Sequence, residues 1–191
     1  MAILRLASAS PRRLELLASI GLRAEVVPSD IDERPLAGES ALEYVTRLAR
    51  DKTLASAGDS RLVTLGADTA VVHDGQILGK PQSRAHAREM LERLSASTHQ
   101  VMTAVAVTGP LGLLDVCVTT RVAMRRIHSH EIDAYWATGE PADKAAGYAI
   151  QGGAAMFIER IEGSYSAVVG LPLFETSELL QRQGVSLWPK R

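Results

Sequence analysis

Apolar residues along the chain recur with two different spacings, and these spacings predict an alternation of strands and helices. Leu14, Leu17 and Ile20 are spaced as on one face of a helix, directly after a short apolar run at residues 3–7 that is typical of a strand. The pattern predicts strands at 3–7, 24–28, 61–72, within 75–83, at 99–107 and at 113–124, and helices at 11–20, 41–57, 83–94, 129–139 and 173–183. Strands and helices alternate early and strands dominate the middle, so we expect an α/β fold with a mixed sheet.

Length and composition bound the class of protein. The chain has 191 residues, 46% of them hydrophobic, which is enough to bury a substantial core. We therefore expect a single domain over residues 1–191, with or without a division into two lobes. A formal net charge of −1 argues against nonspecific binding to nucleic acid or to a membrane surface. Cys117 is the only cysteine, which excludes an intrachain disulfide, and its apolar neighbours predict a small buried side chain.

Two apolar stretches raise the question of a targeting or membrane-spanning segment. Arg5 interrupts the apolar run near the N-terminus, which is too short for the hydrophobic part of a signal peptide. The stretch from Leu94 to Leu114 lacks Asp, Glu, Lys and Arg, but it contains hydroxyl and amide side chains and is broken by "TGPLG". That composition indicates two strands joined by a turn. We expect a soluble, cytoplasmic chain without a membrane span.

The segment "SASPRR" combines a strong helix start with an unfavourable pair of charges. Ser10 suits the N-cap and Pro11 the first helical position, yet Arg12 and Arg13 follow at the positive end of the helix. The two arginines could simply be exposed helix formers, at a cost of a few tenths of a kcal/mol. Alternatively, an anion binds at this helix end, where backbone N–H groups, the two guanidinium groups and the hydroxyls of Ser8 and Ser10 would contact it. In that arrangement the empty protein is slightly strained and the ligand relieves the strain.

Two charged residues fall at positions where an apolar side chain is expected. Lys52 lies on the same helical face as Val45, Leu48 and Ala49, either as a lysine reaching out from the edge of the core or as a cation aimed into an anion site. Asp68 interrupts the apolar run "LVTLGADTAVV", either closing a turn or lying in a buried strand. A carboxylate in a buried strand is costly unless it is paired, hydrogen-bonded or bound to a metal.

The loop "SDIDERP" supplies further carboxylates in Asp30, Asp32 and Glu33, although an acidic surface loop is their default interpretation. Two or three carboxylates beside a phosphate site would bind a hard divalent cation such as Mg²⁺. "GQILGKP" is not a Walker A loop, because three residues separate its glycines where the motif has four, and Pro81 follows the lysine. Lys80 can still bind phosphate.

Together these segments resemble the Maf family of nucleoside triphosphate pyrophosphatases, also called septum-formation inhibitor proteins. The matching segments follow in the family's order along almost the whole chain: "LASASPRR", the "DE" at 32–33, "RLARDK", "GADT", "GKP", "GYAIQG" and "GSYSAVVGLPL". The resemblance implies an α/β fold with a long, bent mixed sheet and two lobes around a central cleft, similar to the inosine triphosphate pyrophosphatases. It also implies an enzyme that depends on a divalent metal, Mg²⁺ or Mn²⁺, and splits a nucleoside triphosphate into a monophosphate and pyrophosphate.

The resemblance also implies residue roles and a substrate. It makes Asp68 the catalytic proton acceptor, a metal ligand or both, and Glu33 its partner in holding the metal. The phosphate-binding residues would be Ser8, Ser10, Arg12, Arg13, Lys52 and Lys80. Within the family, Thr after the catalytic Asp and Gln in the "IQG" segment are features of the branch that acts on dTTP and UTP, and Thr69 and Gln151 match them, with Arg12 as the third specificity position.

The chemistry of the glutamine, two alternative functions and the oligomeric state complete the expectations. A glutamine amide can pair with the O4/N3–H edge of thymine or uracil, so the pyrimidine preference is chemically reasonable. The alternatives are a 7-methyl-GTP type of pyrophosphatase, and a cell-division regulator that acts by binding proteins. The family resemblance further suggests a homodimer.

Overall fold

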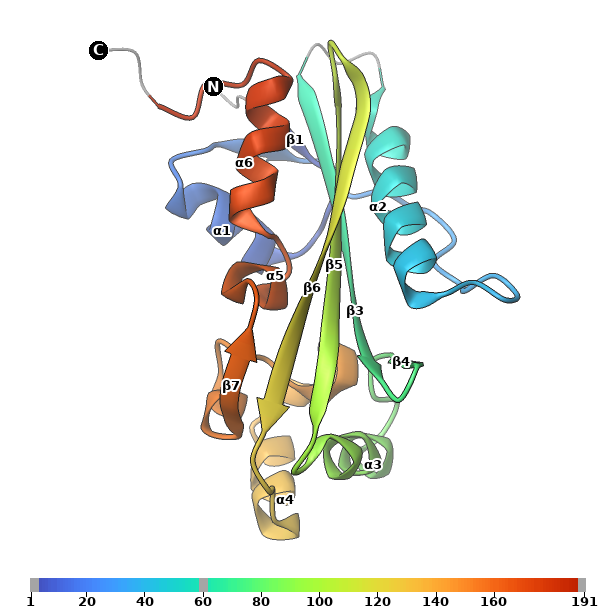
Figure 1. Ribbon diagram of the computed structural model, residues 1–191, viewed down its shortest axis with the longest axis vertical. Coiled ribbons are helices and arrows are strands. Elements are labelled where there is room, and N and C mark those ends of the chain that lie inside the picture. The colour runs from blue at the N-terminus through green and yellow to red at the C-terminus, as the bar shows by residue number, and fades with distance from the viewer. Residues whose placement is uncertain (1–3, 59–61, 189–191) are drawn as a thin grey trace. The chain divides into compact units, whose positions relative to one another are not determined.

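The computed structural model describes residues 4–58 and 62–188, and its elements are labelled in Figure 1. The strands are β1 (Leu4–Leu6), β2 (Ala24–Val26), β3 (Val63–His73), β4 (Gln76–Leu78), β5 (Thr98–Gly109), β6 (Gly112–Met124) and β7 (Ile158–Glu162). The α-helices are α1 (Pro11–Ser19), α2 (Ala41–Ala57), α3 (Arg84–Leu94), α4 (Ser129–Ala137), α5 (Tyr165–Val169) and α6 (Leu173–Arg182). Short 3₁₀ helices are η1 (Glu140–Asp143), η2 (Ala145–Gly147) and η3 (Gly153–Met156).

The strands form one seven-stranded sheet in the order β2-β1-β3-β5-β6-β7, with β4 paired to β3 outside this path. β1 pairs in parallel with both β2 and β3, whereas β4 on β3 and β7 on β6 are antiparallel. The sheet is therefore mixed and flanked by helices, which confirms the predicted fold class. The predicted strands at 3–7 and 61–72 appear as β1 and β3, although Ile3 and Arg61 lie outside the described residues.

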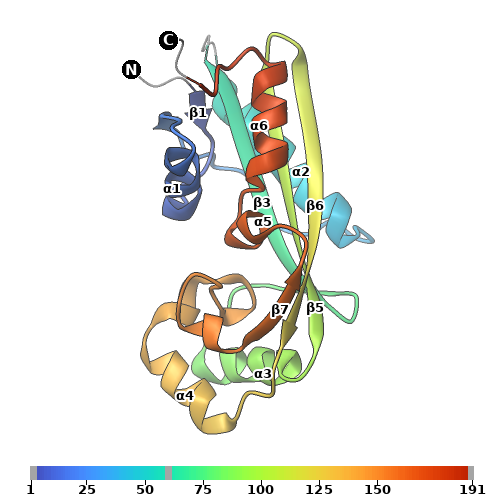
Figure 2. The ribbon, with the colours of Figure 1, turned by 60° about the vertical axis from the view of Figure 1, so that its left-hand side comes forward.

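The chain divides into two compact units, each with its own hydrophobic core. The first unit consists of residues 1–68, 103–118 and 170–191, and the second of residues 69–102 and 119–169. In the first unit, α1 and α6 lie on one side of the strands and α2 on the other, as Figures 1 and 2 show together. The buried core residues on the α1 and α6 side include Leu4, Leu6, Leu17, Leu65, Val105, Leu171 and Leu180.

Helix α2 approaches the strands closely because Gly66 has no side chain. A Cβ at Gly66 would lie 2.5 Å from the Thr53 Oγ1 and 2.8 Å from the Ala49 carbonyl oxygen. The Thr53 hydroxyl donates to that same carbonyl over 2.7 Å and also lies 3.1 Å from the Ala106 carbonyl of β5. This contact brings the last turns of α2 against β3, two residues before Asp68.

The second unit packs around aromatic residues. Its core includes Val71, Leu91, Leu94, Val122, Ile132, Tyr135, Tyr148 and Phe157. The rings of Tyr135 and Phe157 meet edge to face with centroids 5.5 Å apart. His99 is 1% exposed, and its Nε2 lies 2.7 Å from the Tyr148 hydroxyl. Among the residues that the structure describes, the buried members of this core all belong to the second unit.

Several elements agree closely with the sequence pattern. Helix α2 has the predicted bounds and begins with a capping box, in which Ser40 Oγ accepts from the Glu43 N–H and Glu43 Oε2 from the Ser40 N–H. The stretch from Leu94 to Leu114 ends α3 and forms β5 and the start of β6, as predicted. Over the part of the chain that the structure describes, no helix is both long and apolar enough to span a bilayer.

Two details differ from the prediction. Cys117 is only partly buried, because it lies on β6 where the strand borders an open depression lined by Leu42 and Arg47 of α2. Burial still raises the pKa of the Cys117 thiol. The short helix α5 is not among the predicted helices, because its five residues are too few to show a helical period.

Candidate active site

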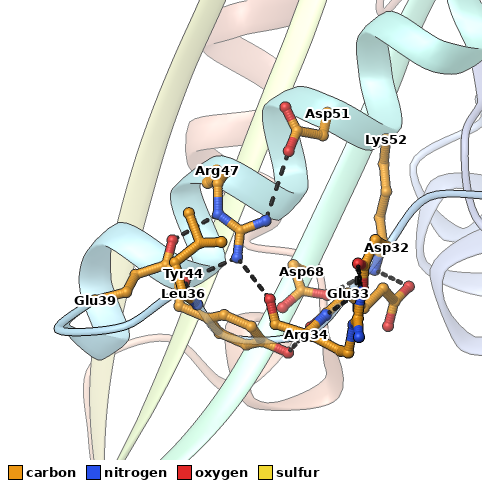
Figure 3. A network of polar contacts seen from close by, with 10 residues as sticks. All are labelled: Asp32, Glu33, Arg34, Leu36, Glu39, Tyr44, Arg47, Asp51, Lys52 and Asp68. Atoms are coloured by element: carbon orange, nitrogen blue, oxygen red, sulfur yellow. Dashed lines mark hydrogen bonds and ion pairs between the residues drawn. The ribbon is translucent and has the colours of Figure 1, made fainter.

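The first unit holds a cluster of one cation between two carboxylates, which Figure 3 shows from close by. The Lys52 Nζ lies 2.7 Å from Asp68 Oδ1 and 2.8 Å from Glu33 Oε1. The side chains of Lys52 and Asp68 are 10% and 12% exposed, whereas the Glu33 side chain is 56% exposed. The cluster therefore has a buried pair at its inner end and a solvent-accessible carboxylate at its outer end.

Backbone structure explains why the two inner charges meet. Lys52 lies on the face of α2 that packs against β3, and the close approach at Gly66 brings that face to the strand. Asp68 lies in the middle of β3, so it does not close a turn. The Lys52 ammonium contacts carboxylates rather than extending to solvent from the edge of the core. Each charge is thus balanced by the other at a site where neither could be buried alone.

The loop that carries Glu33 is held against α2 by two residues that the sequence did not single out. The Tyr44 hydroxyl donates to the Glu33 carbonyl over 3.0 Å, and Arg47 Nη2 donates to the Arg34 carbonyl over 3.2 Å. Arg47 in turn forms an ion pair with Glu39 at 2.6 Å. Tyr44 lies about two helical turns before Lys52, and this i, i+8 spacing along one helix face is the signal that could have identified it.

The remaining acidic residues of the loop do not join the cluster. Asp32 forms an ion pair with Arg34 at 2.6 Å, and that guanidinium lowers the pKa of Asp32 to about 2. Asp30 is exposed. Of the carboxylates proposed in this loop, Glu33 is the one that the structure brings to Asp68.

Burial raises the pKa of the Asp68 carboxyl, while the charges of Lys52 and Arg13 oppose that rise and the nearby Glu33 adds to it. Burial likewise raises the pKa of the Tyr44 hydroxyl, and the negative charges of Asp68 and Glu33 act in the same direction. A carboxylate with a raised pKa can accept a proton more readily than an exposed one.

The "SASPRR" segment begins α1 as predicted but uses its arginines differently. Helix α1 starts at Pro11 after Ser10, and the Ser10 side chain makes no capping hydrogen bond. Ser8 is buried, and its Oγ accepts from the Ser10 N–H over 3.2 Å and from Arg13 Nη1 over 3.0 Å. Arg13 Nε donates to the Gly170 carbonyl over 2.9 Å. Burial lowers the pKa of Arg13, and the Asp68 charge opposes this.

These contacts change the expectation for the empty protein. Arg13 already donates hydrogen bonds to Ser8 and to the Gly170 carbonyl, so its guanidinium group has partners in the empty protein. Arg12 is half-buried and forms no hydrogen bond or ion pair with any residue in the described ranges. The predicted strain at this helix end therefore applies to Arg12, whereas Arg13 also has a structural role.

Three predicted site residues belong to the second unit. Thr69 follows Asp68 in β3 and is half-buried, whereas Lys80 and Gln151 are exposed. The loops of Lys80 and Gln151 are linked through one segment, because the Ala146 N–H donates to the Gly79 carbonyl over 2.8 Å. The second unit thus holds the "GKP" loop beside the start of "GYAIQG".

The two carboxylates of the cluster meet part of what a metal site requires. Within residues 4–58 and 62–188, no three His, Cys, Asp or Glu side chains are grouped so as to hold a metal ion. Glu33 and Asp68 do converge on a single Nζ, so their oxygens share one small region. Such a pair fits a cation like Mg²⁺, which is commonly held by one or two carboxylates together with water and substrate phosphates.

A protein family and several curated relatives match the sequence of this chain over almost its whole length. The family model described as "Maf-like protein" matches residues 3–183. A Vibrio cholerae protein named dTTP/UTP pyrophosphatase is 52% identical over 179 residues, covering 93% of this chain and 96% of that protein. A Geobacter sulfurreducens protein of the same name is 53% identical over 182 residues, covering 94% and 95%. Among solved structures, the Staphylococcus aureus Ham1 protein gives a TM-score of 0.44 at 16% identity, over 63% of this chain and 71% of that one.

Proposed function

Because this chain belongs to the Maf family, we propose that it is a nucleoside triphosphate pyrophosphatase that hydrolyses dTTP and UTP to the monophosphate and pyrophosphate. Relatives about half identical to it over nearly their whole length carry the name dTTP/UTP pyrophosphatase. The observation that carries the chemistry is the Lys52–Asp68 pair, in which a buried carboxylate with a raised pKa lies beside Glu33 and near Arg13.

Asp68 acts as the proton acceptor in this proposal. A water molecule attacks the α-phosphorus, and its proton moves to the Asp68 carboxylate as the new P–O bond forms. The bond between the α-phosphorus and the bridging oxygen breaks, and its electron pair leaves with pyrophosphate. Lys52 keeps Asp68 ionised before the attack, because the ammonium stabilises the negative form of the carboxylate.

Cationic and hydroxyl groups bind the phosphates. Negative charge grows on the leaving pyrophosphate, so stabilising that charge and positioning the chain of phosphates are the main catalytic requirements. Arg12 is the best-supported phosphate ligand in the first unit, since it lies at the N-terminus of α1 without a protein partner in the described residues. The other proposed phosphate ligands are Ser8, Ser10, Arg13, Lys52 and Lys80.

A divalent metal, Mg²⁺ or Mn²⁺, would be held by Glu33 and Asp68. When bound, such a metal neutralises phosphate charge and polarises the phosphorus that is attacked. Glu33 suits this role because its side chain is largely exposed and its backbone is fixed by Tyr44. Lys52 contacts both carboxylates and would keep them close to one another with or without the metal.

Selection of the base is assigned to Thr69, Gln151 and Arg12. An exposed glutamine amide can donate to and accept from the O4/N3–H edge of thymine or uracil. A cytoplasmic location, expected from the sequence pattern, and a homodimer, implied by the family resemblance, are further parts of the proposal.

A nucleotide panel tests the proposal. Purified protein is incubated with dTTP, UTP, dCTP, dGTP and 7-methyl-GTP, with Mg²⁺, with Mn²⁺ and with a chelator, and the products are separated by ion exchange. We expect thymidine and uridine monophosphates plus pyrophosphate, formed with metal only. Nucleoside diphosphate and orthophosphate would contradict cleavage at the α-phosphorus. Preferential cleavage of 7-methyl-GTP would contradict the substrate assignment, and no cleavage of any nucleotide would favour a regulator that binds proteins.

A further inference from the structure

Gln151, one of the residues assigned to base selection, lies in a tight turn of the second unit. The Gly152 N–H donates to the Ala149 carbonyl over 3.1 Å and closes a turn over residues 149–152. Ile150 at the second position of the turn is buried, whereas Gln151 at the third position is exposed. The turn therefore anchors one side chain in the unit and leaves the Gln151 amide at the surface.

Two side chains outside this turn hold both of its ends. The Ala149 N–H donates to the Tyr135 hydroxyl over 3.1 Å, and the Gly153 N–H donates to Glu140 Oε2 over 3.1 Å. The Tyr135 hydroxyl in turn donates to Glu140 Oε1. One carboxylate, directly and through one phenol, thus receives the hydrogen bonds from both ends of the segment that carries Gln151.

The fit around these anchors leaves little freedom. A Cβ on Gly152 would collide with the Glu140 carboxylate, and one on Gly153 would lie 3.2 Å from Tyr135 Cε2. Tyr135 is itself fixed by edge-to-face packing on Phe157. Burial and the neighbouring Glu140 raise the pKa of the Tyr135 hydroxyl, so the phenol keeps its proton and remains the donor to the carboxylate.

From this geometry we propose that Glu140, together with Tyr135, is a positioning residue that fixes the Gln151 amide for recognition of the pyrimidine base. The inference rests on the proposed function, because it assigns to Glu140 an effect on base selection through Gln151. Glu140 is not expected to contact the phosphates or the attacking water. Its loss should therefore affect binding of the nucleotide base while the hydrolytic step continues.

The variant Glu140→Gln tests this. A glutamine has one acceptor oxygen in place of two, so it cannot receive the hydrogen bonds of Tyr135 and Gly153 in the same way. We expect the KM for dTTP to rise about tenfold, with kcat changed less than about twofold, because an interaction with the substrate is lost in ground state and transition state alike. The affinity for inorganic pyrophosphate with Mg²⁺, measured by calorimetry, should stay the same.

A double-mutant cycle tests whether Glu140 affects the KM through Gln151 or independently of it. If Glu140 acts through Gln151, adding Glu140→Gln to Gln151→Ala should change the KM for dTTP by less than about twofold. If the effects of the two substitutions on the KM for dTTP multiply in the double variant, the inference is overturned. The matched control is Glu162→Gln on β7 of the same unit, where the exposed carboxylate pairs with Arg121 and Arg160. This control should leave the KM for dTTP unchanged.

Amide hydrogen exchange gives a readout independent of catalysis. In the unsubstituted protein the N–H groups of Ala149 and Gly153 should be protected, and Glu140→Gln should speed exchange at Gly153. Unchanged exchange together with an unchanged KM would overturn the inference. If Glu140→Gln does not fold, Tyr135→Phe serves instead, because it removes the hydroxyl and keeps the ring, and the same rise in KM is expected.

The two proposals fail in different ways. If the unsubstituted protein does not cleave dTTP, the proposed function is wrong, whatever the exchange data show. If it cleaves dTTP and Gln151→Ala raises the KM while Glu140→Gln and Tyr135→Phe do not, the proposed function stands and the positioning role of Glu140 is wrong.

Discussion

Lys52 and Asp68 form an ion pair across the contact between α2 and β3, with Nζ 2.7 Å from Oδ1 and both side chains nearly enclosed. Two opposing influences act on the pKa of the Asp68 carboxyl at this site. Burial raises the pKa of the carboxyl, and the Lys52 ammonium opposes the rise. On balance the pKa of Asp68 is raised, and a carboxylate with a raised pKa accepts a proton more readily than an exposed aspartate.

Replacement of this carboxylate by an amide, Asp68→Asn, should separate catalysis from folding. Removing the proton acceptor should lower kcat for dTTP by about 10²-fold or more, the usual scale for the loss of a general base. Stability should fall by only about 1–2 kcal/mol, because Lys52 keeps Glu33 as a partner 2.8 Å away and is not left as an unpaired buried charge. Steady-state kinetics and urea unfolding measure the two effects.

Asp32→Asn is the matched control for that substitution. Asp32 lies next to Glu33 but forms an exposed ion pair with Arg34, so its replacement should change neither kcat nor stability by much. A folded Asp68→Asn protein with unchanged kcat would remove Asp68 from the mechanism.

The ammonium of Lys52 should set the pH dependence of activity. Asp68 must be ionised to accept a proton, so activity should decline as the pH falls through its pKa. Lys52 lowers that pKa and burial raises it, so Lys52→Met should move the acid limb of the kcat/KM profile to higher pH. Arg50→Met, two residues earlier on α2 and paired with Asp115, should leave the acid limb in place. An acid limb that does not move in Lys52→Met would show that Asp68 does not control it.

The two arginines of α1 should differ in their effect on stability. Arg13 donates to Ser8 and to the Gly170 carbonyl, so Arg13→Gln should destabilise the empty protein by about 1–3 kcal/mol. Arg12 has no such partner in the described residues, so Arg12→Gln should leave stability unchanged or raise it by a few tenths of a kcal/mol at the positive end of the helix.

Thermal unfolding with and without pyrophosphate and Mg²⁺ measures both the stability and the phosphate binding of the two arginine variants. The ligand-induced rise in melting temperature should shrink in both variants, because both lose a guanidinium that binds phosphate. A full ligand-induced rise in Arg12→Gln would contradict a role for Arg12 in phosphate binding.

The close approach of α2 to β3 should make Gly66 sensitive to substitution. In Gly66→Ala the new Cβ would meet the Thr53 N and the Ala49 carbonyl oxygen at 2.8 Å, so the helix must move. We expect a loss of about 1–3 kcal/mol, typical of overpacking, and a lower kcat as Lys52 shifts away from Asp68. Gly79→Ala is the stability control, since a Cβ at Gly79 would have nothing within 4 Å. Equal stability of Gly66→Ala and the unsubstituted protein would contradict the tight contact.

Much of the fold follows from local signals in the sequence. Ser40 and Glu43 have the spacing of a capping box, which indicates the observed start of α2. Asp68 interrupts an apolar run, which indicates a buried carboxylate, and β3 carries it as expected. Lys52 stands out in the same way, from its place on an apolar helix face.

The contacts that hold the site were not predictable, because they join segments far apart in the chain. The carbonyl that binds Arg13 belongs to Gly170, 157 residues away, and no local pattern indicates such a contact. The hydrogen bond from Tyr44 to the Glu33 backbone depends on how an irregular loop folds over α2. Hydrophobic spacing identifies the elements and their buried faces, whereas tertiary packing decides which polar groups meet.

The buried ring of His99 should make the second unit sensitive to acid. Burial together with the nearby His73 lowers the pKa of His99 to about 4. Its Nε2 contacts the Tyr148 hydroxyl, and its Nδ1 has no partner among residues 4–58 and 62–188. Within those same residues, no carboxylate acts on the ring to stabilise its charged form. An unfolded histidine has a pKa near 6.5, so the unfolded chain binds more protons than the folded one between about pH 6.5 and 4.

Stability should therefore be complete above about pH 6.5 and decline as the pH falls toward 4, and His99 alone should account for a loss of about 2 kcal/mol at pH 5. His99→Gln keeps a partner for the Tyr148 hydroxyl but cannot gain a proton, so its stability should fall by about 2 kcal/mol less between pH 8 and pH 5. His130→Gln, exposed at the start of α4, should keep the original pH dependence. Urea unfolding at the two pH values measures the difference, and an identical acid loss in His99→Gln would show that another group is responsible.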